Sequence, residues 1–190
     1  VACLVESGSL LVVLSSSPWL TFKDLIEASK KAPGKITYTS SGTFGTNHLI
    51  PEGLAKEAGV KWNHIPSQGS GPAITATLGG HINMASTAVA PAAPHIKAGT
   101  LRPLAAYGNK RLQAFPDVPT LQELGYTIAS PSYYGILAPK GTPKPVVDAL
   151  YAAAQKAVET YNAQIKTRLE PFGVDIKLMN PEEYKTWLNS

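Results

Sequence analysis

The sequence predicts an α/β fold in which a mostly parallel sheet is flanked by helices. Short apolar or β-branched runs alternate with longer stretches of helical periodicity, the pattern of repeated strand–helix units. Sixteen glycines and 16 prolines place turn signals between these stretches. Apolar residues make up 44% of the 190 residues and charged residues only 16%, a balance that supports a sizeable core and excludes a coiled coil or a charge-driven disordered chain.

The first elements are predicted by a buried run and by helix caps. Residues 10–14 form a continuous branched apolar run, typical of a strand buried on both faces. The next helix begins with a capping box of Thr21 and Asp24 and ends at Pro33-Gly34. Residues 36–39 predict a second strand, followed by a loop of small residues at 40–46. A helical pattern follows, and Pro51 predicts that its first turn lies later than the apolar spacing suggests.

The same unit then recurs along the middle of the chain. Strands are expected at residues 62–65, 82–85 and 101–106, and helices at 73–78 and 91–98. Pro72 is placed at the first helical position, and glycines close both helices. Thr120 and Glu123 predict a capping box for a further short helix that ends at Gly125.

The last third of the chain predicts two more strands and several helices. Strands are expected at 133–138 and 174–178. A helix capped by Thr142 carries one apolar face through Val158, and a separate helix is expected at 162–169. Asn180 and the residues after it predict a capped terminal helix.

Charge, cysteine and histidine content exclude several functions. The net charge of +4 is scattered rather than gathered in a stripe, so no nucleic-acid partner is expected. The single cysteine, Cys3, forms neither an internal disulfide nor a cysteine zinc site. No two of the four histidines stand three or four residues apart, so we expect no metal and no cofactor.

Motifs for catalysis and nucleotide binding are missing. The chain contains neither the G-x-S-x-G elbow of serine hydrolases nor a P-loop. Gly69 and Gly71 begin like a dinucleotide fingerprint, but Ile74 replaces the third glycine and Pro72 removes an amide donor. We therefore expect no catalytic residue.

Two loops of small residues are the candidate binding elements. Residues 40–46 and 67–72 each join the carboxyl end of a predicted strand to the start of a helix. Glycines let a ligand approach the backbone, and free amides at a helix N-terminus suit a carboxylate or phosphate. Loops of this kind converge on one crevice in a parallel sheet. Ordinary capped turns have the same composition, so both interpretations stay open on residue chemistry alone.

An ordered set of motifs resembles a known bacterial family. The matching stretches are Pro33-Gly34-Lys35-Ile36-Thr37-Tyr38, Ser40-Ser41-Gly42-x-x-Gly45-Thr46-x-His48, Pro66-x-x-Gly69-Ser70-x-Pro72-Ala73, Leu78-Gly79-Gly80, Pro94-His95-Ile96-Lys97-Ala98-Gly99-x-Leu101-Arg102, Pro116-Asp117-Val118-Pro119-Thr120-x-x-Glu123-x-Gly125 and Tyr134-Gly135-Ile136-Leu137-Ala138-Pro139-x-Gly141-Thr142-Pro143. Together they cover nearly the whole chain and resemble the solute-binding proteins of tripartite tricarboxylate transporters, the TctC or Bug family.

The resemblance implies a function and a site. It implies a periplasmic binding protein of type II-like fold, with two α/β lobes, that captures a small carboxylate and delivers it to a membrane permease. It also implies a third cleft loop at Thr87-Ala88-Val89 and no enzymatic activity. The ligand-binding residues expected are Ser40, Ser41, Gly42, Thr43, Gly45, Thr46, Gly69, Ser70, Gly71, Thr87 and Ala88. The ligand itself is left open among mono-, di- and tricarboxylates, amino acids and aromatic acids.

Two departures from the family qualify the expectation. The chain resembles a family member that lacks the first part of its N-terminal lobe, and residues 1–14 have no basic start or cleavage site of a signal peptide. We expect a crossing segment and remnant of the first lobe at 1–19, a complete second lobe at 20–130, and a return strand with first-lobe helices at 131–190. Ser67-Gln68 replaces the usual aromatic and lysine, and Asn83 a common acid. An α/β hydrolase and a ligand-binding sensor module are the alternative functions.

Overall fold

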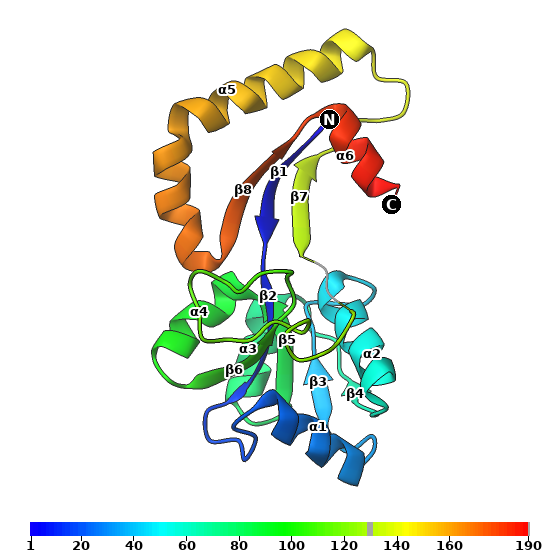
Figure 1. Cartoon of the computed structure of the whole chain (residues 1–190), viewed down its shortest axis with the longest axis vertical. Coiled ribbons are helices and arrows are strands. Elements are labelled where there is room, and N and C mark those ends of the chain that lie inside the picture. Colours follow the sequence, from blue (N-terminus) through cyan, green and yellow to red (C-terminus); the bar gives the residue numbers. More distant parts are fainter. Residues whose placement is uncertain (129–130, 190) are drawn as a thin grey trace. The chain divides into compact units, whose positions relative to one another are not determined.

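The computed structural model describes residues 1–128 and 131–189 and divides the chain into two compact units (Figure 1). Unit 1 consists of Val1–Ser7 and Ser132–Ser190, and unit 2 of Gly8–Pro131. Each unit has its own sheet. Among the described residues, no helix combines the length and apolar character that a membrane span requires.

Unit 2 is built on a five-stranded sheet in the order β4-β3-β5-β2-β6. The bounds of its strands are β2 Ser9–Leu14, β3 Thr37–Thr39, β4 Asn63–His64, β5 Met84–Ala88 and β6 Leu101–Ala106. Its helices are α1 Phe22–Lys31, α2 Thr46–Ala58, α3 Ser70–Leu78 and α4 Val89–Lys97. Helices cover both faces of this sheet (Figure 1).

The alternation of side chains along β2 explains this three-layer arrangement. Leu11 and Val13 join a core cluster with residues of α1 and α2, whereas Leu10 and Val12 join a second cluster with residues of α3 and α4. All four side chains are completely buried. The prediction of a strand buried on both faces is therefore confirmed, because the unbroken apolar run supplies both layers.

The expected strand directions are wrong at β2. β3 pairs in parallel with β4 and with β5, but β2 pairs antiparallel with both β5 and β6. Four strands thus run one way and β2 runs against them, so the sheet is mixed rather than mostly parallel. Apolar runs buried on both faces look the same in either direction, and the sequence pattern could not reveal the reversal. The α/β class, with sheets flanked by helices, is confirmed.

Unit 1 has a three-stranded antiparallel sheet in the order β7-β1-β8. Its elements are β1 Ala2–Ser7, β7 Ser132–Ile136, α5 Lys144–Leu169, the 3-10 helix Glu170–Phe172, β8 Val174–Met179 and α6 Pro181–Leu188. The predictions included no strand at β1. α5 contains the two helices expected on either side of residue 160, which meet at a kink at Tyr161, where the backbone is not helical (φ −111°, ψ 17°).

Two other local expectations need correction. Residues 120–125 form turns rather than a helix, although Thr120 and Glu123 make the predicted reciprocal hydrogen bonds. Gly125 takes a φ of +89°, which ends the segment after a single turn. Pro51 does not delay α2, which begins at Thr46 and accommodates the proline within its length.

Candidate functional site

Three connections lie together at one edge of the unit 2 sheet. β4, β3 and β5 are parallel neighbours, so their carboxyl ends meet at the same edge. Residues 40–45 lead from β3 to α2, residues 65–69 lead from β4 to α3, and β5 runs directly into α4. The hydroxyls of Thr39 and Ser67 lie 2.8 Å apart, and the Ser67 amide donates to the Ser40 carbonyl at 3.0 Å. The first two predicted loops are therefore in direct contact.

The helices that begin at this edge have no side-chain caps. The N-cap residues of α2, α3 and α4 are Gly45, Gly69 and Ala88, and none provides a capping hydrogen bond. In contrast, α1 and α6 are closed by capping boxes at Thr21 and Asn180. The sequence thus caps helices elsewhere and leaves three positive helix ends open at one edge of one sheet.

Several backbone amides at this edge have no protein acceptor. Within residues 1–128 and 131–189, no hydrogen bond is donated by the main-chain N–H groups of Ser41, Gly42, Thr43, Gly45, Thr46, Ser70 and Gly71. An anion placed over these groups would accept charge-assisted hydrogen bonds and lie at the positive ends of α2 and α3.

Two glycines at this edge have no conformational reason to be glycine. Gly45 has a φ of −87°, and no atom lies within 4 Å of a methyl group built on it. Gly71 has the same open space and no positive φ. Gly42 and Gly69 differ, because their φ angles of +140° and +115° disfavour any side chain. Both positions leave open space for a ligand to approach the backbone.

Some of the predicted site residues have accessible side chains, whereas others use their hydroxyls in hydrogen bonds within the loops. Ser41 and Thr43 are exposed and accessible to a ligand. Ser40 is completely buried, and its hydroxyl donates to the Gly42 carbonyl at 2.5 Å. Thr87 is also completely buried, with its hydroxyl directed at the Ala88 carbonyl at 3.3 Å. The side chains of Ser40 and Thr87 therefore stabilise the loops and do not face the solvent.

Asn83 does not lie at this edge of the sheet. Its side-chain oxygen accepts hydrogen bonds from the amide and hydroxyl of Thr37, at 2.9 and 3.0 Å. These contacts join the start of β3 to the residue before β5, at the opposite end of the strands. The departure from an acid at this position therefore concerns strand pairing and not the candidate site.

Three stacked rings near the first loop belong to residues that are not among the predicted site residues. The rings of His48 and His64 stack with centroids 4.1 Å apart, and Tyr38 stacks on the other side of His64 at 4.6 Å. The Nδ1 atom of His48 accepts from the Phe44 amide at 3.1 Å. His64 Nε2 lies 2.8 Å from the Ser40 hydroxyl. In the sequence, the position of His48 three residues after Gly45 is the feature that could have indicated its place beside the loop.

Burial and neighbouring charge act on this stack. Burial lowers the pKa of His64 below its usual value, and the nearby His48 lowers it further, while Glu52 acts in the opposite direction. The Tyr38 hydroxyl donates to Glu52 at 2.6 Å, and burial together with that carboxylate raises the Tyr38 pKa. Both groups are thus held uncharged at neutral pH. Among the described residues, no cluster of three or more His, Cys, Asp or Glu side chains is suited to a metal ion.

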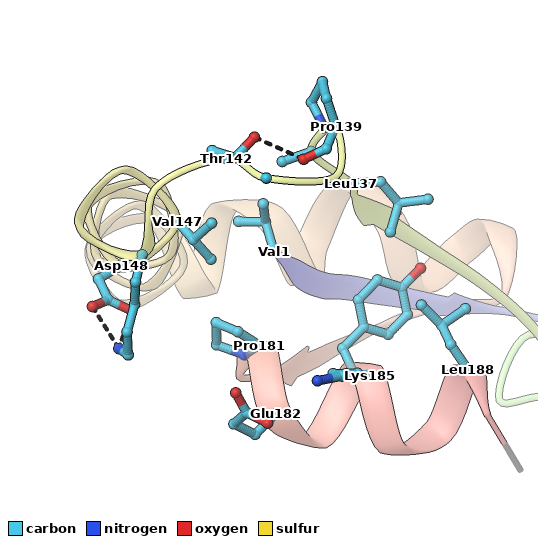
Figure 2. Close-up of a pocket in the computed structure, with 14 residues that line it drawn as sticks. Val1, Leu137, Pro139, Thr142, Val147, Asp148, Pro181, Glu182, Lys185 and Leu188 are labelled. Atoms are coloured by element: carbon cyan, nitrogen blue, oxygen red, sulfur yellow. Dashed lines mark hydrogen bonds and ion pairs between the residues drawn. The ribbon is translucent and has the colours of Figure 1, made fainter.

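Unit 1 contains a separate cavity of about 520 Å³ (Figure 2). It is lined by the start of the chain, the 137–142 turn, the first turns of α5, and α6. Lys144 and Asp148 pair with each other at 2.7 Å, and Asn180 caps the amides at the start of α6. No predicted site residue lines this cavity. Its lining includes the carboxylates of Asp148 and Glu182, which repel an anion, whereas residues 40–46 and 65–71 of unit 2 contain no carboxylate.

Comparison with known proteins identifies the relatives of the chain. The family described as "Tripartite tricarboxylate transporter family receptor" (TctC) matches residues 1–189. A protein of Cupriavidus necator, described as "UPF0065 protein in gbd 5'region", is 42% identical over 175 residues. That match covers 92% of this chain and 52% of the relative. The chain thus spans about half the length of this relative.

Solved structures share the fold. A structure described as a periplasmic transporter has a TM-score of 0.90 and 34% identity, covering 98% of this chain and 62% of its own. Rhodopseudomonas palustris Rpa4515 with adipate has a TM-score of 0.89 and 25% identity, covering 100% and 63%. MatC from the same organism, with bound malate, has a TM-score of 0.83 and 25% identity, covering 96% and 61%.

The family and the fold are those of solute-binding proteins rather than enzymes. The match runs through both units, and the motifs around residues 40–48 and 66–73 lie within it. On these grounds the chain belongs to the tripartite tricarboxylate transporter receptor family, TctC.

Proposed function

We propose that this chain forms part of a solute-binding protein whose unit 2 binds a carboxylate group of a small organic acid. The observation that carries the proposal is the cluster of unpaired amides at the uncapped starts of α2 and α3 on one sheet edge. A carboxylate there accepts hydrogen bonds from Ser41, Thr43, Gly45 and Thr46. The amides of Ser70 and Gly71 lie at the start of α3, next to the first loop.

Backbone amides suit a receptor better than charged side chains do. The described residues of the two loops, 40–46 and 65–71, contain no lysine, arginine, aspartate or glutamate. The anion is therefore balanced by helix dipoles and N–H groups, which need no titration and no flexible side chain. The adipate and malate complexes of the structural relatives make dicarboxylates the first ligands to test.

The lobe assignment and the partners follow from the family. In this proposal, unit 2 with its complete sheet is the second lobe, and unit 1 belongs to the first lobe. We place the protein in the periplasm, where it delivers its ligand to the membrane permease of a tripartite transporter. The TctC match and the likeness to a periplasmic transporter support this placement.

A charge-matched thermal-shift experiment tests the proposal. The chain is heated with adipate, with malate, and with adipamide as the neutral counterpart of adipate. Ligand at about a hundred times its dissociation constant adds roughly 2.7 kcal/mol of stability, so an acid that binds raises the melting temperature by several degrees. Adipamide has no carboxylate and leaves the temperature unchanged. An equal shift with adipamide, or ester hydrolysis lost on a single Ser→Ala change, would contradict the proposal.

A further inference from the structure

The loop at 41–46 is held by the stacked rings of His48 and His64 and not by its own contacts. Phe44 takes a φ of +63°, in the left-handed region that disfavours residues other than glycine. Phe44 is 79% exposed, so burial does not compensate for this conformation. The hydrogen bond from the Phe44 amide to His48 Nδ1, at 3.1 Å, is the contact that fixes this residue.

This hydrogen bond defines the protonation of His48. The amide donates its proton, so Nδ1 must offer a lone pair and the imidazole must be neutral. A second proton on Nδ1 would leave two donors facing each other and break the contact.

The side chains of three residues pack around His48. The His64 ring from β4 stacks on it with centroids 4.1 Å apart. The Phe44 ring meets it edge-on at 5.8 Å, and the Tyr38 hydroxyl lies 3.4 Å from its backbone carbonyl. Glu52, one turn further along α2, is the only nearby charge of opposite sign among the contacts of this cluster in the described residues, and it already accepts from Tyr38.

His64 extends the same support to the other side of the loop. Ser40 donates its one hydroxyl proton to the Gly42 carbonyl, so His64 Nε2 donates to the Ser40 oxygen at 2.8 Å. The chain of contacts therefore runs from His48 to Phe44 on one side and from His64 through Ser40 to Gly42 on the other. Both ends of the stretch that presents the unpaired amides are anchored to one stack of rings.

We propose that His48 is a positioning residue of the carboxylate site, which fixes the amides of residues 41–46 through the Phe44 hydrogen bond only while its ring is neutral. The proposal rests on the carboxylate-binding function proposed above. It predicts that loss of the acceptor at position 48 weakens carboxylate binding, whereas a substitute that still accepts from the Phe44 amide preserves it.

Affinity measurements on three variants test this role. Titration calorimetry with malate and adipate at pH 8 compares the wild-type chain with His48→Asn, His48→Phe and His81→Phe. Asparagine can accept from the Phe44 amide but does not titrate, and phenylalanine keeps the stacking without an acceptor. His81 lies in the exposed turn before β5, so its variant controls for loss of a histidine.

The expected pattern is specific to the proposal. His48→Phe binds about two- to tenfold more weakly than wild type, the range expected for loss of one hydrogen bond. His48→Asn and His81→Phe bind like wild type. A His48→Phe variant that binds like wild type, or a His48→Asn variant that loses as much affinity as His48→Phe, would overturn the proposal.

A ligand-free measurement separates failure of this inference from failure of the proposed function. Amide NMR of the chain without ligand follows hydrogen exchange of the Phe44 N–H. We expect protection in wild type and His48→Asn that is lost in His48→Phe. If neither acid binds the wild type, the proposed function fails, and the Phe44 amide still decides the role of His48: an unprotected or unchanging amide would refute it.

Discussion

Replacement of Gly45 by leucine separates binding from folding at the candidate site. Gly45 is the N-cap of α2, with an extended backbone (φ −87°, ψ 172°) that any residue adopts. A methyl group built there meets no atom within 4 Å, so leucine fits without displacing the fold. The added side chain instead occupies the space over the neighbouring amides, where the ligand carboxylate is proposed to lie.

The expected magnitudes differ widely for stability and for binding. Losing a favoured N-cap residue costs about 1 kcal/mol. Replacing a glycine lowers the conformational entropy of the unfolded chain, which stabilises the folded state by roughly 0.4–1 kcal/mol. The net change in stability is therefore within about 1 kcal/mol, or a few degrees in melting temperature. Displacing the carboxylate from the amides of Gly45 and Thr46 removes two charge-assisted hydrogen bonds at roughly 1.5–3 kcal/mol each, which raises the dissociation constant more than about a hundredfold.

Calorimetry with adipate and a parallel thermal melt measure both quantities. Ser16→Leu serves as the matched control, because it adds an exposed leucine in the turn after β2, at the opposite edge of the sheet. The control is expected to bind like wild type. A Gly45→Leu chain that melts normally and binds adipate within threefold of wild type would refute the placement of the site.

Three further changes test the supporting structure. Ser29→Ala removes the acceptor of the buried Trp62 indole N–H, a 2.7 Å contact, and should lower the free energy of unfolding by about 1–3 kcal/mol in urea denaturation. Glu57 accepts from two backbone amides at 2.7 and 3.2 Å, chiefly that of Thr127, and these bonds lower its pKa. Its contribution is present above the ordinary pKa of glutamate and is lost as pH falls through the lowered value, so Glu57→Gln should flatten the acid limb of a melting-temperature profile. Asn83→Asp keeps an acceptor for Thr37 and should leave adipate affinity unchanged; a changed affinity would mean that position 83 acts on the site after all.

Local sequence signals predicted most elements because those elements depend on local chemistry. The capping boxes at Thr21 and Asn180 fix the starts of α1 and α6, and both were visible in the sequence. The reversed direction of β2 was not, since its apolar run is buried on both faces whichever way it runs. β1 also escaped prediction, because its sequence ACLVES carries no clear alternation and its partners are β7 and β8, more than 120 residues away.

The candidate site was predictable in part for a similar reason. The loops at 40–46 and 67–72 stood out through glycines and hydroxyls, and parallel neighbouring strands bring them together. Composition did not reveal that Ser40 and Thr87 use their hydroxyls internally. Nor did it show that His64 stacks on His48, because that contact joins β4 to α2 across the sheet edge.

The central claim is that a carboxylate binds the open amides of unit 2, and amide NMR during an adipate titration tests it most directly. Amide signals respond even to weak binding, so the experiment also detects a weakly bound ligand. We predict saturable shifts centred on Thr43, Gly45 and Gly71, with none from adipamide. Shifts centred instead on the unit 1 cavity around Thr142 and Lys185, or no shift at any amide of residues 41–46, would contradict the account.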